Sequence, residues 1–125
     1  MVIIARTALE IIETHLRPGK VVLLLGARRT GKTFLLNDVL SNHQHEGCLL
    51  RNGEDFGVQD LLQRRSAVHY RELLQGIALL IIDEAQHVPE IGKFLKLMVD
   101  SCPDLKVLVS GSSAFGLDDQ TGACV

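Results

Sequence analysis

The chain has 125 residues, of which 46% are hydrophobic and 22% charged, proportions that suit one soluble globular domain. Its formal net charge of -2 and pI of about 6.2 give no overall basic field, so the charge does not indicate binding to nucleic acid, although a local basic patch would still permit it. The three cysteines have no paired spacing and indicate neither a disulfide framework nor a zinc site. No apolar run approaches the ~20 residues that cross a bilayer, so we expect a cytoplasmic protein with no membrane contact.

The chain begins with a predicted helix and a predicted buried strand. Thr7 and Glu10 have the spacing of a capping box, which predicts a helix over residues 8–16. The run KVVLLL, residues 20–25, is continuously apolar and rich in β-forming residues. Such a run is typical of a strand that is buried on both faces of a parallel sheet.

The segment GARRTGKT follows this strand and matches the Walker A pattern GxxxxGK[ST]. In such a loop the glycines allow backbone N–H groups to surround the phosphates of a nucleotide, and the lysine places a cation near the β and γ phosphates. The hydroxyl of Thr33 is suited to bind Mg²⁺. The alternative is a glycine turn with surface cations. The predicted nucleotide-binding residues are Gly26, Ala27, Arg28, Arg29, Thr30, Gly31, Lys32 and Thr33.

Apolar residues at helical spacing predict a helix after this loop, and CLLRN, residues 48–52, can form a second strand. VQDLL and YRELL resemble short helices, and IALLII, residues 77–82, is a second buried strand. Asp83 and Glu84 follow it, at the edge of an α/β sheet where ligands bind. We expect Asp83 to hold Mg²⁺ and Glu84 to accept a proton from the attacking water, although an acidic turn explains the same residues. His87 follows closely and could sense the nucleotide, but we interpret it as a polar residue that precedes a helix.

The remaining pattern predicts a helix that begins near Pro89, with Ile91, Phe94, Leu95 and Met98 on one face, and a strand over residues 105–110. Alternating strands and helices predict an α/β fold: a mainly parallel sheet in three layers, with helices on both faces. The last strand leads into Ser110 and Ser112. A hydroxyl there would contact the γ phosphate or the attacking water, unless the segment is only a glycine-serine turn.

Together the segments GARRTGKT, LLIIDEAQHVPE and LKVLVSGSSAF resemble the ATPase core of the AAA+ superfamily, and more narrowly the bacterial and archaeal AAA-type ATP-binding proteins that usually carry a further C-terminal domain. This resemblance implies a P-loop ATPase core over residues 1–125 that binds ATP and Mg²⁺. It implies that Lys32 and Thr33 belong to Walker A and that Asp83 and Glu84 form Walker B. Ser110 and Ser112 would supply the catalytic residue called sensor 1.

Family members continue past the point that corresponds to Val125, with a further strand, a candidate arginine finger and a lid. We therefore expect the chain to lack the last strand of the sheet and the lid, to leave an open edge beside the phosphate-loop strand, and to hydrolyse ATP slowly by itself. Three functions stay open: an ATPase, an ATP-dependent interaction module that contacts a protein partner or another copy of itself, and a phosphotransferase. A GTPase is disfavoured because no NKxD-type motif is present.

Overall fold

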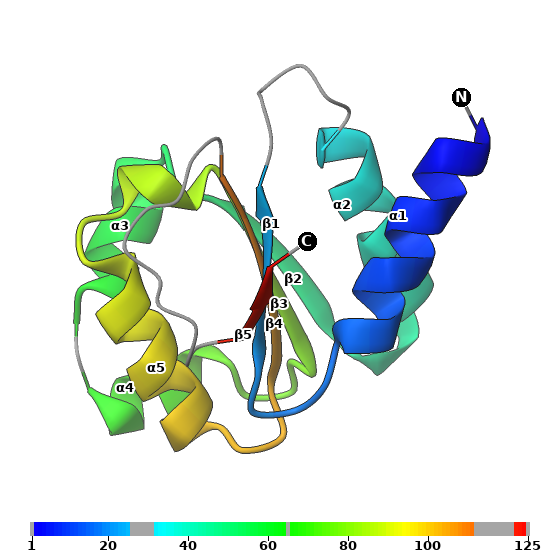
Figure 1. Ribbon diagram of the computed structural model, residues 1–125. Helices are drawn as coiled ribbons and strands as arrows, with labels where there is room; N and C mark the ends of the chain where they lie inside the picture. Colours follow the sequence, from blue (N-terminus) through cyan, green and yellow to red (C-terminus); the bar gives the residue numbers. More distant parts are fainter. Residues whose placement is uncertain (1, 26–31, 65, 112–121, 125) are drawn as a thin grey trace.

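In the computed structural model, which describes residues 2–25, 32–64, 66–111 and 122–124, one parallel sheet separates two layers of helices (Figure 1). The strand order is β2-β3-β4-β1-β5, and every neighbouring pair is parallel. The strands are β1 (Val21–Leu25), β2 (Cys48–Asn52), β3 (Leu79–Asp83), β4 (Lys106–Gly111) and β5 (Gly122–Cys124). The predicted three-layer α/β fold is therefore confirmed.

Helices α1 and α2 cover one face of the sheet, and α3, α4 and α5 cover the other (Figure 1). The helices are α1 (Val2–His15), α2 (Lys32–His43), α3 (Phe56–Leu62), α4 (Ala67–Leu73) and α5 (Ile91–Ser101), with short 3₁₀ turns η1 (Gln44–Glu46) and η2 (Ala85–His87). Among the described residues, no helix combines the length and hydropathy that a membrane span requires.

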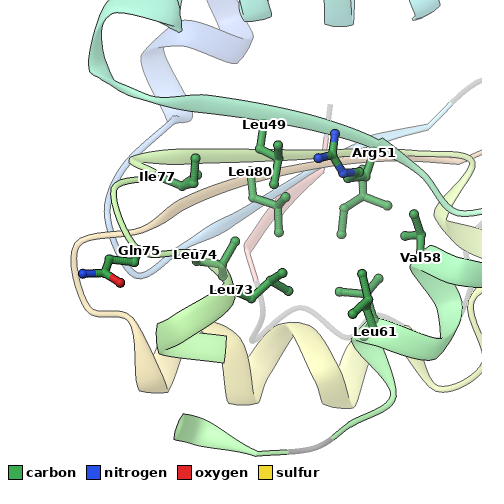
Figure 2. A pocket seen from close by; sticks show the side chains of 11 residues that line it. Leu49, Arg51, Val58, Leu61, Leu73, Leu74, Gln75, Ile77 and Leu80 are labelled. Atoms are coloured by element: carbon green, nitrogen blue, oxygen red, sulfur yellow. The ribbon is translucent and has the colours of Figure 1, made fainter. Parts of the chain in front are cut away.

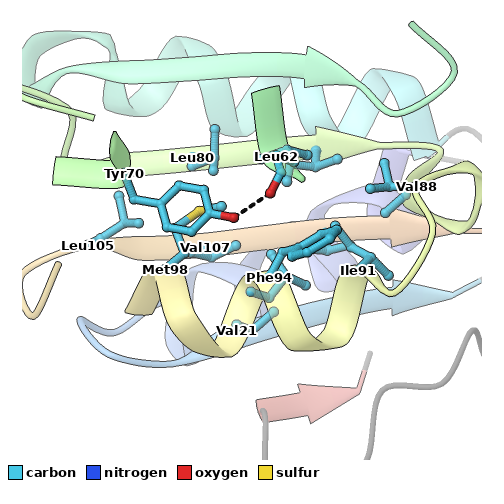
Figure 3. Packing of buried hydrophobic residues seen from close by; sticks show 14 of the residues in the cluster. Val21, Leu62, Tyr70, Leu80, Val88, Ile91, Phe94, Met98, Leu105 and Val107 are labelled. Atoms are coloured by element: carbon cyan, nitrogen blue, oxygen red, sulfur yellow. Dashed lines mark hydrogen bonds between the residues drawn. The ribbon is translucent and has the colours of Figure 1, made fainter. Parts of the chain in front are cut away.

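Alternate residues of the central strands enter two separate cores, which explains their continuous apolar sequences. In β3, Leu80 and Ile82 pack toward α3–α5, whereas Leu79 and Ile81 pack toward α1 and α2. In the first core, Phe94 and Met98 of α5 lie against the sheet, and the hydroxyl of Tyr70 donates a hydrogen bond to the carbonyl of Leu62 (Figure 3). The predicted buried face of α5 is confirmed.

Two expectations about the ends of the chain are wrong. Helix α1 begins at Val2, so Thr7 lies inside it and does not cap it. A capping pair is a local signal worth only about 1 kcal/mol, and the same spacing also occurs inside helices. The expected open edge of β1 is instead paired with β5 over three residues, Gly122–Cys124. A segment this short shows no periodic pattern, yet its backbone can satisfy the hydrogen bonds of β1.

A cavity of about 250 Å³ lies between strands β2 and β3 and helices α3 and α4. Its wall is mostly leucine, isoleucine and valine, with Arg51 and Gln75 as the polar exceptions (Figure 2). Of the candidate site residues that the structure describes, none lines it. The cavity is thus separate from the place where the sequence predicts nucleotide chemistry.

Candidate nucleotide site

The ends of three parallel strands bring the predicted site residues to one edge of the sheet. Strand β4 lies between β1 and β3, so a hydroxyl at the end of β4 lies beside the strand that enters the phosphate loop. Leu25 of β1 is paired with Gly111, and Ile82 is paired with Val109. Asp83 and Ser110 follow that second pair. We call this side, where the strands end, the carboxyl edge.

Lys32 is the first residue of α2, and its side chain is buried, with 4% of the residue exposed. Its ammonium donates a hydrogen bond of 2.7 Å to the carbonyl of Gly111 at the end of β4. The helix therefore directs a cation across the end of β1 toward β4. The other predicted Walker A residues, Gly26–Gly31, and the side chain of Thr33 lie outside the described residues.

Asp83 and Ser110 form a direct side-chain contact. Ser110 is fully buried, and its hydroxyl donates to Oδ1 of Asp83 at 2.5 Å. The same Oδ1 accepts a hydrogen bond of 2.9 Å from the backbone N–H of Glu84. These two bonds fix the carboxylate that was predicted to hold Mg²⁺. Ser112, the second predicted sensor residue, lies outside the described residues.

Glu84 has a left-handed backbone, with φ 54° and ψ 42°, which a residue other than glycine adopts only at a cost in free energy. Its side chain is 12% exposed. The amide of Gln86 donates a hydrogen bond of 2.8 Å to Oε2 of Glu84, and Nε2 of His87 lies 3.7 Å from the same oxygen. No sequence pattern indicated a role for Gln86, and His87 was interpreted as a polar residue before a helix rather than as a residue that senses the nucleotide.

The turn between β2 and α3 supports the backbone at Asp83 and Glu84 from the other side. The N–H of Gly53 donates to the carbonyl of Asp83 at 2.7 Å, and a Cβ atom on Gly53 would lie 2.5 Å from the carbonyl oxygen of Glu84. Gln59 of α3 donates a hydrogen bond of 2.8 Å to the carbonyl of Gly53. No sequence motif indicates these residues, because their role depends on how β2 packs beside β3.

The carboxylate of Glu54, in this turn, also approaches the site. Ligand-type atoms of Glu54, Glu84 and His87 all lie within 4.8 Å of one another. The edge therefore combines a buried ammonium, a hydrogen-bonded aspartate and serine, and a partly buried glutamate. This set can bind a polyphosphate with its cation and move a proton from water.

Comparison with known proteins agrees with this geometry. The sequence profile of the AAA domain matches residues 18–123. The chain belongs to the AAA domain family. It is an AAA+ P-loop core and a nucleotide-binding module.

An uncharacterized protein of Methanocaldococcus jannaschii is 32% identical to this AAA domain over 110 residues, which cover 82% of the chain and 23% of that protein. Two solved structures share the fold. A DNA replication initiation factor superposes with a TM-score of 0.62 at 17% identity and covers 98% of the chain. AMPPCP-bound DnaA from Aquifex aeolicus gives 0.57 at 16% identity, also over 98% of the chain. The chain spans 43% and 44% of these two proteins.

Proposed function

We propose that this AAA domain binds ATP together with Mg²⁺ and hydrolyses the bond to the γ phosphate, with Glu84 as the general base. The observation that carries the proposal is the arrangement at the carboxyl edge. The buried ammonium of Lys32 reaches the end of β4 through Gly111, and the hydroxyl of Ser110 contacts Asp83. Three separate segments thus deliver a cation, a carboxylate and a hydroxyl to adjoining strand ends.

In this proposal Lys32 attracts the β and γ phosphates, and residues 26–31 surround them with backbone N–H groups. Thr33 and Asp83 would hold Mg²⁺, which would neutralise charge on the phosphate oxygens. The donor set fits, because hydroxyl and carboxylate oxygens are the ligands that Mg²⁺ takes. Glu84 accepts the proton of the attacking water, and Ser110, with Ser112 as the second candidate, orients Asp83 or the water.

The binding step is tested by substituting Lys32. Loss of one charge-assisted contact costs about 1.5 to 3 kcal/mol, so Lys32→Ala should bind a fluorescent ATP analogue roughly 10- to 150-fold more weakly than the parent. Lys96→Ala is the matched control, because Lys96 is exposed on α5. Equal affinity of the parent and Lys32→Ala would contradict the proposed phosphate site.

The magnesium assignment has its own test. Asp83→Asn removes the negative charge but keeps the shape of the side chain, so binding of the analogue should lose much of its dependence on Mg²⁺ concentration. The titration is run with and without EDTA for both proteins. If ATP binds but no turnover depends on Glu84, the alternative function is supported: an ATP-dependent interaction module.

A further inference from the structure

We infer that Gln86 and Gly53 are positioning residues that hold Glu84 at the site of water attack. The inference rests on the proposed function, in which Glu84 is the general base. Gln86 acts on the carboxylate, and Gly53 acts on the backbone of the same residue. A general base must be held close to one geometry, because a displacement of about 1 Å can reduce a rate by roughly 100-fold.

The first support comes from the turn η2, which begins directly after Glu84. The left-handed conformation of Glu84 turns the chain so that residues 86 and 87 lie beside its own side chain. Gln86 then donates to Oε2 at 2.8 Å, while Nε2 of His87 lies 3.7 Å from that oxygen. The hydrogen bond from Gln86 thus restricts rotation of the carboxylate, and the ring of His87 lies beside the same oxygen.

The second support comes from the turn after β2. The backbone N–H of Gly53 donates a hydrogen bond to the carbonyl of Asp83. A Cβ atom at position 53 would overlap the carbonyl oxygen of Glu84. Gln59 holds the carbonyl of Gly53, and Oδ1 of Asn52 accepts a bond of 2.8 Å from the N–H of Glu54. These two hydrogen bonds hold the turn in place, so we expect an added methyl group at position 53 to displace the backbone at Glu84.

The kinetic test uses single-turnover hydrolysis, with the chain in excess over ATP, and the affinity for the fluorescent analogue. We expect Gln86→Ala to hydrolyse ATP about 10-fold more slowly and Gly53→Ala about 100-fold more slowly than the parent. Affinity should stay within about twofold, because neither residue belongs to the proposed phosphate site. The matched controls are Gln63→Ala, which alters an exposed side chain, and Gly57→Ala, whose Cβ would meet, among the described residues, the Asp55 side chain alone, at 3.2 Å.

Action through Glu84 is tested in the Glu84→Gln background. There, Gln86→Ala should cause no further loss of rate, since residues that act as a unit are not additive. If Glu84→Gln hydrolyses ATP as fast as the parent, Glu84 is not the general base and the proposed function is contradicted. If Glu84→Gln is slow but Gln86→Ala and Gly53→Ala are as fast as the parent, the proposed function stands and the positioning inference is overturned.

A second readout does not need turnover. A different pair of substitutions, Gln86→Ala and Glu84→Ala, is compared in urea unfolding as a double-mutant cycle, because each of them removes the hydrogen bond between the two side chains. We expect the two effects on the folding equilibrium constant to be coupled by about threefold or more, as contacting side chains are. Strictly additive effects would show that Gln86 does not hold Glu84, and would overturn the inference even for a chain whose turnover is too slow to measure.

Discussion

The two edges of the sheet differ in which residues adopt the left-handed backbone conformation. At the amino edge, where the strands begin, the described residues with positive φ are glycines: Gly19, Gly47 and Gly76 precede β1, β2 and β3. On the side where the strands end, the described residues with positive φ are Glu84 and Glu90. Glycine adopts this conformation without strain, whereas a glutamate does so at a cost of about 1 to 2 kcal/mol.

The amino edge is built mainly for stability. The carbonyl of Gly47 accepts hydrogen bonds from the N–H groups of Ala78 and Leu79, at 2.8 and 3.2 Å, and these bonds join the starts of β2 and β3. Nearby, Lys106 donates to Glu46 at 2.9 Å. Backbone bonds and ion pairs satisfy this edge, so no special side chain is needed at the left-handed positions.

The carboxyl edge keeps a glutamate where a glycine would be easier to accommodate. A glycine at position 84 would relieve the backbone but would remove the carboxylate that Gln86 contacts. Strain of this kind persists where the side chain is needed, and it motivates a functional hypothesis. The difference between the two edges therefore supports the proposed role of Glu84, and four further experiments can break or sharpen it.

The largest expected effect is on turnover. Glu84→Gln keeps the shape of the side chain and its contact with Gln86 but removes the basic carboxylate, so Glu84-dependent hydrolysis should fall by about 10²- to 10⁴-fold. Binding of the fluorescent ATP analogue should be retained. Steady-state phosphate release from parent and variant purified in parallel measures the effect. A variant that is as fast as the parent would remove the functional reason for the strained residue.

The next effect tests the amino edge. Gly47 has φ 86°, and a Cβ there would lie 2.2 Å from the carbonyl oxygen of Gly76. Gly47→Ala should therefore lower the free energy of unfolding by about 3 kcal/mol or more, through backbone strain and steric overlap. Gly19→Ala is the control, because Gly19 has a similar φ of 80° and no atom of the described residues lies within 4 Å of the added methyl. It should cost only about 1 kcal/mol.

Urea unfolding of both variants measures this difference. Equal losses of stability would show that the close approach of the two loops does not constrain the amino edge. ATP affinity, measured on the folded protein, should be the same in both variants and the parent, since both glycines lie at the opposite edge from the site.

A smaller effect concerns pH. His43 at the end of α2 lies between two carboxylates, 2.6 Å from Glu13 and 2.8 Å from Glu46. Burial lowers the pKa of His43, but hydrogen bonds to Glu13 and Glu46 and their charges outweigh burial, so the pKa is raised above 6.5. The folded state thus binds the proton more tightly than the unfolded state. The stabilisation is complete below pH 6.5 and is lost as pH rises through the raised pKa.

We therefore expect the parent's free energy of unfolding to decrease as pH rises from about 6 through the raised pKa. His43→Gln should remove this dependence and should cost about 1 to 2 kcal/mol at pH 6, where charged hydrogen bonds are lost. His45→Gln is the control, because His45 is exposed on the neighbouring turn. An unchanged pH profile in His43→Gln would show that His43 is not the group whose protonation causes this dependence.

The sequence predicted the parts of the site that follow directly from strands. Buried apolar runs located β1, β3 and β4, and parallel order brought Asp83 and Ser110 together. Gly53 and Gln86 were not predicted. The contacts of Gly53 depend on a turn that packs against a neighbouring strand, and the contact of Gln86 depends on the left-handed conformation of Glu84. Strand β5 was not predicted for a different reason. Its three residues are too few to show a periodic pattern, and their pairing with β1 is a long-range contact.

The smallest effect tests the strain at Glu84 directly. Glu84→Ala and Glu84→Gly both remove the carboxylate, so their difference reports on the backbone alone. At φ 54° the alanine is strained by about 1 to 2 kcal/mol, while the greater freedom of glycine in the unfolded chain costs about 0.4 to 1 kcal/mol. Glu84→Gly should therefore be more stable than Glu84→Ala by up to about 1.6 kcal/mol, with a central value of about 0.8 kcal/mol.

The same pair of substitutions at Lys96, in the interior of α5, should give the opposite sign, because glycine is about 1 kcal/mol less favourable than alanine inside a helix. Urea unfolding of the four variants gives both differences under one set of conditions. If glycine were the less stable residue at position 84 as well, the left-handed glutamate would carry no strain. The contrast between the two edges would then reflect only local chain geometry, and the functional argument would rest on the side-chain contacts of Glu84 alone.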